Sequence, residues 1–496
     1  MTRSNSLRPS ILRLFYAGVL SAVMLLGACA TNPATGGRDF VLMSEDAEIA
    51  QGRELHPKVM QVYDEYDDAE LQALVKNVGT TLAENSERNN LIFRFTLLDS
   101  DQVNAFALPG GYIYITRGLL AYLNSEAELA AVLGHEIGHV TARHSVRQQT
   151  KSTLAGLAGM AVAIGTGSSD AYNLSQLLGA AVLSGYGRKM ELEADALGAR
   201  YLANNAYTPQ AMIDVISVLK DQEVYEKDRA VKENREPRVY HGLFSTHPRN
   251  DTRLQEVIEE ASSLAPDAPA VSVAEREAFI RMQDQMLFDK PAKEGITRGN
   301  SFYHKDLDFA FDFPAAWRVV NFPAYIDIYA PANAAIIRMG TDDLNKKITP
   351  REFLIERVKV KRMHSDEALE INGMPAHTAM GRGTTPWGTR DIRYTVIYQG
   401  ERAYVFQSAV KDKNMHAEFD PFFQTTAASF RYMSDADTAN AKPQRLVLHR
   451  VQAGETIESL TANSPIPVYA AEQIRLLNAL YPDLQPQSGQ LIKLVE

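Results

Sequence analysis

The segment AVLGHEIGHV, residues 131–140, places two histidines and a glutamate inside an otherwise apolar run. Chargeable side chains in such a run are costly to bury unless a partner compensates them. Ser125 and Glu128 form the S-x-x-E pattern of a capping box, which predicts that a helix begins there. On this helix His135 and His139 lie one turn apart, at the border of the apolar face.

A divalent metal ion would compensate these side chains. Zinc accepts two imidazole nitrogens at positions i and i+4 of one helix face, so His135 and His139 are predicted zinc ligands. Glu136 points beside the metal and is predicted to act as the general base, taking a proton from a zinc-bound water during peptide hydrolysis. The alternative is a pair of core histidines with a paired glutamate.

A catalytic zinc site needs a third protein ligand. The metzincin pattern fails, because Ala142 and Ser145 stand where that pattern requires Gly and His. On a continuous helix His144 lies about 140° around the axis from His139, so it is not expected to reach the same ion.

The downstream segment GRKMELEADALGARYLA predicts a second helix that can supply the missing group. Glu191 and Asp195 are at positions i and i+4 of one face, while Glu193 points elsewhere. Glu191 can ligate the metal, and Asp195 can brace a ligand histidine. Taken alone, ELEAD is typical of a solvated acidic face, and its value comes from completing a site that lacks one ligand.

HEIGH followed about fifty residues later by ELEAD resembles the HtpX/CAAX-protease-type zinc metalloproteases. These are gluzincins, peptidase family forty-eight of the metallo class, and the BepA-like periplasmic branch is the most similar. Three further segments agree, and they are NAFALPGGYIYITRGLL at 104–120, GYGRKMELEAD at 185–195 and STHPRNDTR at 245–253. The resemblance covers about residues 40–265.

The resemblance implies one Zn²⁺ per chain, with Glu191 as its third ligand and Asp195 as an active-site acid. It also implies that His247 can approach the zinc. Such a histidine can fill the open coordination position and keep the enzyme inactive. BepA continues with helical repeats, whereas this chain continues with strands. The partner assigned to those repeats is therefore not carried over.

Within residues 104–116, Pro109-Gly110-Gly111 is typical of a turn and YIYIT alternates as a strand. Paired glycines let a foreign backbone come close, and zinc proteases pair their substrate with an edge strand beside the active helix. A plain hairpin is the alternative.

The N-terminal residues 1–28 carry three arginines and no acidic residue, and an apolar run follows the last arginine. This is the plan of a secretory signal peptide. It ends in LGAC and resembles a bacterial lipobox, in which Cys29 would be acylated and become the new N-terminus. Ala30, in place of Asp, implies sorting to the outer membrane of a Gram-negative bacterium. An ordinary signal peptide is the alternative.

With 496 residues the chain is too long for one core, which predicts a multidomain fold. The expected order is a signal peptide at 1–28, a tether at 29–43, a mainly α zincin-type protease domain with a small β-sheet at 44–265, a linker and helix at 266–299, an α+β domain of unknown role at 300–433, a linker at 434–445 and a β-α-α-β LysM-like module at 446–496. In the α+β domain, FAFDFPAAWRVVN resembles the PsbP/Mog-type sandwich, a likeness that yields no function.

The last module resembles a LysM domain at Val451, Gly454 and the segment GQLI. Such domains bind N-acetylglucosamine in peptidoglycan, which implies a cell-wall partner. Glu455 replaces the usual Asp after the glycine, so a purely structural LysM fold is the alternative.

The net charge of −10 argues against a nucleic-acid partner. We therefore expect a zinc endopeptidase that is anchored in the outer membrane, faces the periplasm and degrades misfolded or stalled envelope proteins. The alternatives are a chaperone or assembly lipoprotein whose zinc site is held closed, and a wall-binding scaffold.

Overall fold

The computed structural model describes residues 29–34, 36–41, 43–156, 186–233, 270–290, 294–322 and 325–496. The chain forms two compact units, of which unit 1 runs to Gln283 and also includes Leu476–Pro482. Unit 2 holds most of the remainder, from Asp284. No helix in the described ranges is both long and apolar enough to cross a membrane.

Unit 1 is mainly helical, as the sequence predicts. Ser44, Asp68 and Ser125 each accept a backbone N–H from the first turn that follows, so three of the helices begin at these capping side chains. The helices are α2 (Glu45–Val59), α3 (Ala69–Glu84), α4 (Arg117–Leu120), α5 (Glu126–Thr141), α6 (His144–Gly156), α9 (Arg188–Asn204), α10 (Gln210–Lys232) and α13 (Val273–Met282).

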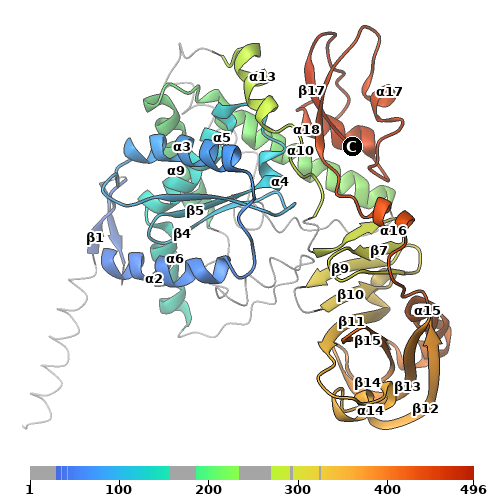
Figure 1. Cartoon of the computed structure of the whole chain (residues 1–496). Helices are drawn as coiled ribbons and strands as arrows, with labels where there is room; N and C mark the ends of the chain where they lie inside the picture. The colour runs from blue at the N-terminus through green and yellow to red at the C-terminus, as the bar shows by residue number, and fades with distance from the viewer. Residues whose placement is uncertain are drawn as a thin grey trace, which may run out of the picture. The chain divides into compact units, whose positions relative to one another are not determined.

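A three-stranded sheet crosses unit 1 and lies between α2 and α3 (Figure 1). Its strands are β3 (Arg94–Leu98), β4 (Ala105–Leu108) and β5 (Tyr112–Thr116). The order is β3-β5-β4, so the YIYIT segment is the central strand and β4 lies at an edge. The edge strand of the predicted hairpin is therefore AFAL and not YIYIT.

The two glycines of the β4–β5 turn have positive φ, +80° at Gly110 and +89° at Gly111. A Cβ on Gly110 would lie 2.9 Å from the Cα of Ile49, and one on Gly111 would lie 2.9 Å from the carbonyl oxygen of Ile92. These glycines make room for the chain's own backbone. The expectation that they admit a foreign backbone stays a prediction.

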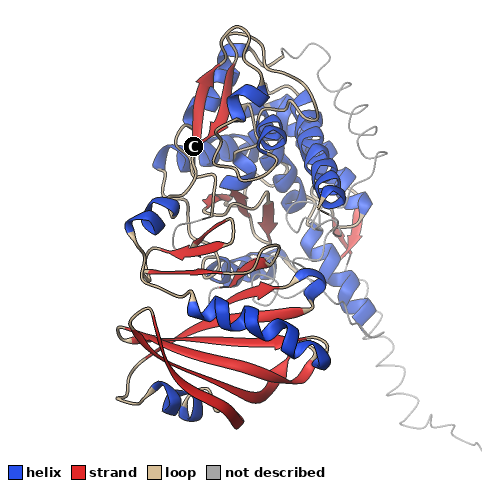
Figure 2. Cartoon of the chain, turned by 90° about the vertical axis from the view of Figure 1, so that its right-hand side faces the viewer, coloured by secondary structure: helices blue, strands red, loops and turns tan. Residues whose placement is uncertain are grey.

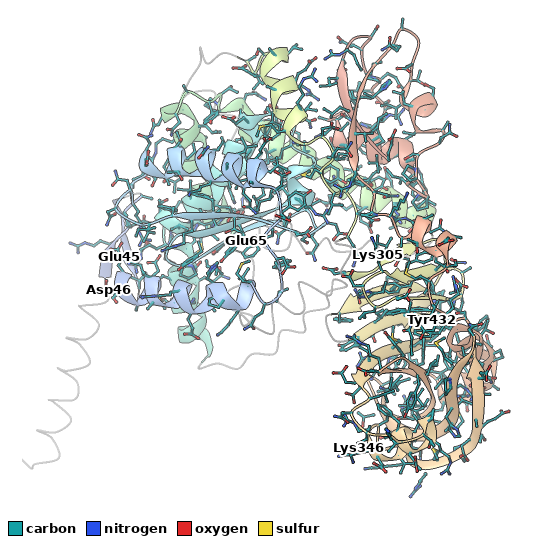
Figure 3. The ribbon with its side chains drawn as sticks, in the orientation of Figure 1. Glu45, Asp46, Glu65, Lys305, Lys346 and Tyr432 are labelled. Carbon is teal, nitrogen blue, oxygen red and sulfur yellow. The ribbon has the colours of Figure 1, made fainter. Side chains whose placement is uncertain are left out.

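The segment expected to be a tether contains a short hairpin. Strands β1 (Cys29–Thr31) and β2 (Arg38–Phe40) pair in antiparallel fashion, with Cys29 opposite Phe40. Helix α2 follows, and Glu45 and Asp46 in its first turn (Figure 3) place negative charge at the positive end of the helix dipole.

Unit 2 contains a seven-stranded antiparallel sheet with helices on both faces (Figure 2). Successive side chains of a strand point to opposite faces, so Ile337 joins the core under α15 while Ile336 joins the core under α14. In sheet order the strands are β12 (Lys361–Ile371), β13 (Met374–Thr385), β14 (Gly388–Gln399), β15 (Arg402–Val410), β11 (Ala335–Asp343), β10 (Tyr325–Tyr329) and β9 (Arg318–Phe322). The helices are α14 (Pro350–Glu356) and α15 (His416–Ala428).

A second, three-stranded sheet adds three phenylalanines to the α15 side of this core, Phe302, Phe309 and Phe311. Its strands are β6 (Ile296–Arg298), β7 (Ser301–His304) and β8 (Phe309–Asp312). Strand β6 lies before residue 300, where the α+β domain was predicted to begin. The stretch 434–445, expected to be only a linker, contains α16 (Asp435–Asn440).

The C-terminal residues have the predicted β-α-α-β order. The elements are β16 (Leu446–Arg450), α17 (Ile457–Thr461), α18 (Ala470–Leu477) and β17 (Leu491–Val495). The two strands pair in antiparallel fashion, with Leu446 opposite Val495. This order agrees with a LysM-like module, and the likeness itself stays a prediction.

Candidate metal centre

Helix α5 begins at the predicted cap. The Oγ of Ser125 accepts the N–H of Glu128 at 3.2 Å, and the Glu128 carboxylate reaches back to the N–H of Asn124, at 2.8 Å. In a capping box Glu128 would accept the N–H of Ser125 itself, whereas here it accepts the N–H of the preceding residue, Asn124. Every residue of α5 after the first is buried, and Glu136 is only 1% exposed. The chargeable side chains of the opening segment therefore lie in the protein interior.

Helix α9 crosses α5 closely because small residues meet at the crossing. A Cβ on Gly138 would lie 2.9 Å from the carbonyl oxygen of Ala194, a distance at which one helix must shift. At Gly134 the nearest atoms, those of Gly198, would be 3.4 Å away. This close approach brings the first turn of α9 against the histidines of α5.

The structure brings the three predicted metal ligands together. The Nε2 atoms of His135 and His139 are 3.0 Å apart, and the two oxygens of Glu191 lie 3.7 Å and 3.6 Å from them, respectively. Among the described residues this trio is the one group of three or more His, Cys, Asp or Glu side chains placed to hold a metal ion.

These separations fit zinc. Tetrahedral zinc with bonds of 2.0–2.2 Å requires ligand atoms about 3.3–3.6 Å from one another. The observed separations of 3.0, 3.6 and 3.7 Å lie within a few tenths of an ångström of that range. Asp195 Oδ1 lies 2.7 Å from Nδ1 of His135, so we assign the proton of that ring to Nδ1. The lone pair of its Nε2 then faces His139 and Glu191, where a cation would stabilise it. Asp195 therefore braces a ligand, as expected.

The ring of Tyr186 covers the second ligand. It stacks on His139 with centroids 4.1 Å apart and planes 19° apart, and its hydroxyl lies 2.7 Å from Ser145 Oγ. Burial raises the pKa of Tyr186, the hydrogen bond with Ser145 opposes this, and the nearby carboxylates of Glu136 and Glu191 add to it. The phenol thus stays protonated beside the two carboxylates.

His144 is the residue that sequence reasoning missed. It is not a member of the metal-binding trio, as expected, but its Nδ1 lies 2.7 Å from Nδ1 of His139. The angle of about 140° assumed a continuous helix. Instead α5 ends at Thr141, Arg143 has a φ of +54°, and α6 begins at His144. The chain turns and brings the imidazole back, and the H-x-x-x-x-H spacing was the available signal.

Glu193 is not a metal ligand, but neither does it belong to a solvated acidic face. Its Oε2 lies 3.2 Å from Nε2 of His144 and 2.8 Å from the Arg147 guanidinium, and its Oε1 accepts from Asn32 at 3.1 Å. Burial acts to raise the pKa of Glu193, but the contacts with His144 and Arg147 outweigh it and lower the pKa to about 2.

Two predicted residues cannot be placed at the site. His247, the predicted switch, lies outside the described residues. Cys29 is described only as the first backbone position of β1, and its side chain lies outside what the structure describes.

Comparison with known proteins agrees with this geometry. Residues 68–261 match the model of Peptidase family M48. The beta-barrel assembly-enhancing protease of Yersinia pestis is 30% identical over 285 residues, 52% of this chain and 55% of that protein. The mitochondrial metalloendopeptidase OMA1 of Arabidopsis thaliana is 33% identical over 144 residues, 29% of this chain and 29% of that protein.

Among solved structures, the cyanobacterial PsbP protein of Synechocystis aligns with 28% of this chain and 95% of its own, at 11% identity and a TM-score of 0.23. A score this low does not establish a shared fold, so the PsbP-like architecture stays a prediction. The chain spans about half the length of the Yersinia protease, and its ligand-bearing helices α5 and α9 lie within the matched residues 68–261. Residues 68–261 thus match Peptidase family M48, and this part of the chain holds the buried trio His135, His139 and Glu191, which is able to bind a metal ion.

Proposed function

We propose that the whole protein is a zinc-dependent endopeptidase of the bacterial envelope. The observation that carries the proposal is the buried trio His135, His139 and Glu191, with Glu136 on the same helix between the two histidines. A structural zinc site would need four protein ligands, whereas a catalytic site uses three and keeps one position open.

In this proposal each side chain has a separate task. His135, His139 and Glu191 hold the zinc, and Asp195 orients His135 through its Nδ1. Bound zinc would act as a Lewis acid at the scissile carbonyl and would lower the pKa of water. Glu136 takes the proton of the attacking water and passes it to the leaving amine, since its carboxylate is buried beside the ligands.

Strand β4 is the proposed docking edge for the substrate backbone. It is the edge strand of the described β3-β5-β4 sheet, and it contacts α5, which carries the histidines. An extended peptide can add to such an edge by main-chain hydrogen bonds, which suits a protease that reads unfolded chains. The central strand β5 is paired on both sides and cannot serve in this way.

The proposed substrates are unfolded or misassembled envelope proteins. A relative with 30% identity is named as a beta-barrel assembly-enhancing protease, and the sequence carries a candidate lipobox at Cys29. We propose an outer-membrane lipoprotein that faces the periplasm, with cell-wall contact through the C-terminal module. Cys29→Ser should move the protein from the membrane fraction to the soluble fraction, and unchanged membrane retention would contradict the anchor.

The test of the enzymatic proposal is Glu136→Gln in the purified chain. The amide keeps the shape of the side chain and removes no ligand, so about one zinc per chain should remain. Cleavage of an unfolded outer-membrane protein should fall by two or more orders of magnitude, since general-base catalysis typically contributes 10²–10⁴-fold. His139→Ala is the matched control and should lose the zinc as well. Near-normal cleavage by Glu136→Gln would overturn the proposal.

A further inference from the structure

The two histidine ligands are held in different ways. His135 presents its Nδ1 to the carboxylate of Asp195, at 2.7 Å. His139 presents its Nδ1 to a second imidazole, that of His144, with 2.7 Å between the two Nδ1 atoms. Both residues that face these histidine rings lie in the interior, with Asp195 1% and His144 0% exposed.

Only one proton fits between two nitrogens at 2.7 Å, and its place follows from the metal site. A histidine that ligates through Nε2 keeps that atom unprotonated and carries its proton on Nδ1. His139 is then the donor and His144 Nδ1 the acceptor. His144 in turn carries its proton on Nε2, which lies 3.2 Å from Oε2 of Glu193, an electrostatic contact that lacks the alignment of a hydrogen bond.

The carboxylate of Glu193, which faces His144, is held in place by further contacts. Arg147 bridges Oε2 of Glu193, at 2.8 Å, and Oδ2 of Asp39, at 3.3 Å. Asn32 donates to the same two carboxylates, at 3.1 Å to Glu193 and 2.9 Å to Asp39. The β1–β2 hairpin therefore packs its polar side chains against the carboxylate that faces His144.

We propose that His144 and Glu193 are positioning residues for the zinc ligand His139, acting through the contacts Glu193–His144–His139. They fix the tautomer and the ring orientation of His139, the task that Asp195 performs for His135. The proposal rests on the proposed zinc site. Removing such an outer partner typically costs 10- to 100-fold in metal affinity.

The experiment measures zinc affinity by chelator competition on the full chain, with no substrate present. His144→Leu fills the space but offers no acceptor, and its Kd for zinc should rise 10- to 100-fold. His144→Asn places an amide oxygen near the position of the imidazole Nδ1, and it should recover most of that loss. The visible spectrum of the Co²⁺-loaded protein should change in the leucine variant and stay close to wild type in the asparagine variant.

Glu193→Gln gives a second route should the leucine variant fail to fold. It keeps the side-chain shape, removes the charge that faces His144, and should weaken zinc binding in the same direction by less. An unchanged zinc Kd in His144→Leu, or equal losses in the leucine and asparagine variants, would overturn the proposal, since packing alone would then explain His144. Full activity of Glu136→Gln with these affinity losses intact would instead overturn the proposed function alone.

Discussion

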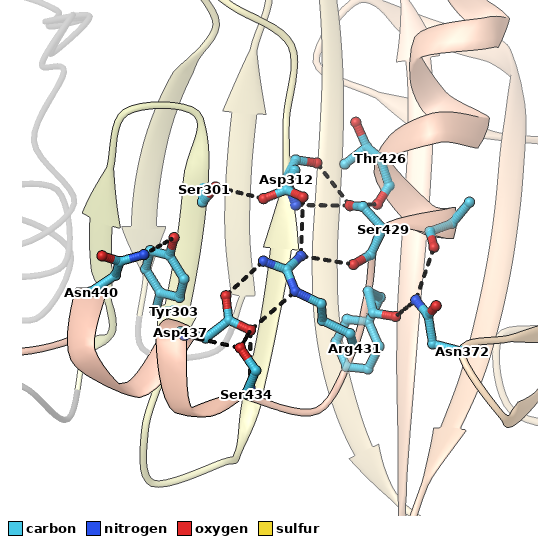
Figure 4. Close-up of polar contacts among 12 residues, drawn as sticks. Ser301, Tyr303, Asp312, Asn372, Thr426, Ser429, Arg431, Ser434, Asp437 and Asn440 are labelled. Carbon is cyan, nitrogen blue, oxygen red and sulfur yellow. Dashed lines mark hydrogen bonds and ion pairs between the residues drawn. The ribbon is translucent and has the colours of Figure 1, made fainter.

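The metal centre of unit 1 and the arginine network of unit 2 are both dense polar clusters, but they are balanced differently. In unit 2 the guanidinium of Arg431 lies between two carboxylates, at 2.8 Å from Asp437 and 3.0 Å from Asp312 (Figure 4). In unit 1 the Nε2 atoms of two imidazoles and the carboxylate of Glu191 converge, with their ligand atoms within 4.8 Å of one another. The first cluster is complete within the protein, whereas the second is built around a cation.

This difference separates structural from functional polar groups. Arg431 also donates to the carbonyl of Ser429, and Ser434 donates to Asp437, so the network ties α16 to β8 and to the end of α15. Each donor meets an acceptor, as expected of polar groups that only stabilise a fold, and Asp437 is the buried member of the network. A buried group of converging acceptors is instead a site where a ligand supplies the missing charge.

Among substitutions that test this difference between the two clusters, we expect the largest effect at the crossing of α5 and α9. Gly138→Ala places a Cβ 2.9 Å from the carbonyl of Ala194, so α9 must shift and carry Glu191 away from the histidines. We expect a loss of about 1–3 kcal/mol in unfolding free energy and clearly weaker zinc binding. Circular dichroism melting and chelator competition measure the two quantities.

Gly134→Ala is the matched control on the same helix. Its Cβ would lie 3.4 Å from Gly198, an ordinary contact, and alanine raises helix propensity by up to about 1 kcal/mol. It should keep zinc affinity and leave stability unchanged or slightly higher. Tryptophan fluorescence should not move in either variant, because Trp317 and Trp387, the chain's two tryptophans, both lie in unit 2. Equal zinc affinity in the two variants would show that the crossing does not set the site.

A smaller effect is expected at the network of unit 2. The hydrogen bond from Arg431 lowers the pKa of Asp437 to about 2, against the effect of burial and with help from Ser434. A carboxyl whose pKa is lowered on folding stabilises the fold above its unfolded pKa, near 3.8, and this is lost as the pH falls toward 2. We expect Asp437 to contribute about 1–2 kcal/mol at pH 5 and almost nothing near pH 2.

Urea unfolding followed by tryptophan fluorescence measures this contribution in unit 2. The quantity is the difference in unfolding free energy between wild type and Asp437→Asn, at pH 5 and at pH 2.5. Arg431→Met should shrink the difference, since the guanidinium is the main cause of the lowered pKa. Zinc stoichiometry at neutral pH should stay the same in both variants, and a difference that did not depend on pH would contradict the assignment.

The smallest effect is expected where the N-terminal hairpin meets the metal centre. Asn32→Ala removes one donor to Glu193, but Arg147 still holds that carboxylate. We expect the zinc Kd to rise by less than about fivefold, the equivalent of about 1 kcal/mol, because a single hydrogen bond contributes about that much. A rise as large as that of His144→Leu would instead make the hairpin an essential part of the centre.

The sequence predicts the core of the metal site because its geometry is local. His135, His139 and the pair Glu191 and Asp195 are each spaced by one helical turn, and both helices form as expected. The contact of His144 could not be read in this way. It depends on the end of α5 and on the left-handed backbone at Arg143, which tertiary contacts with Glu48 and the carbonyl of Met43 hold in place.

The sheet of unit 2 can be predicted from the sequence only where its strands are apolar. The segments that form β9, β10, β11, β14 and β15 are rich in apolar residues, and they contribute buried side chains such as Ile328 and Val396 to the core. Strand β12 is largely exposed, so no apolar alternation marks it. Strand β13 carries its small buried residues, such as Ala376 and Ala379, among glycines and threonines, so its sequence does not indicate a strand.

The hairpin that begins at Cys29 limits the distance that could separate an anchor on Cys29 from the protease domain. A free tether of residues 29–43 could extend about 50 Å, at 3.3–3.6 Å per residue. Strand β1 instead starts at Cys29 itself, and Asn32, three residues later, is already bonded to Glu193 of the catalytic domain. If Cys29 carried an acyl chain, almost no flexible linker would separate the domain from the membrane. Such a protease would be confined to a thin layer at the bilayer surface, and it could cleave only substrates that reach this layer.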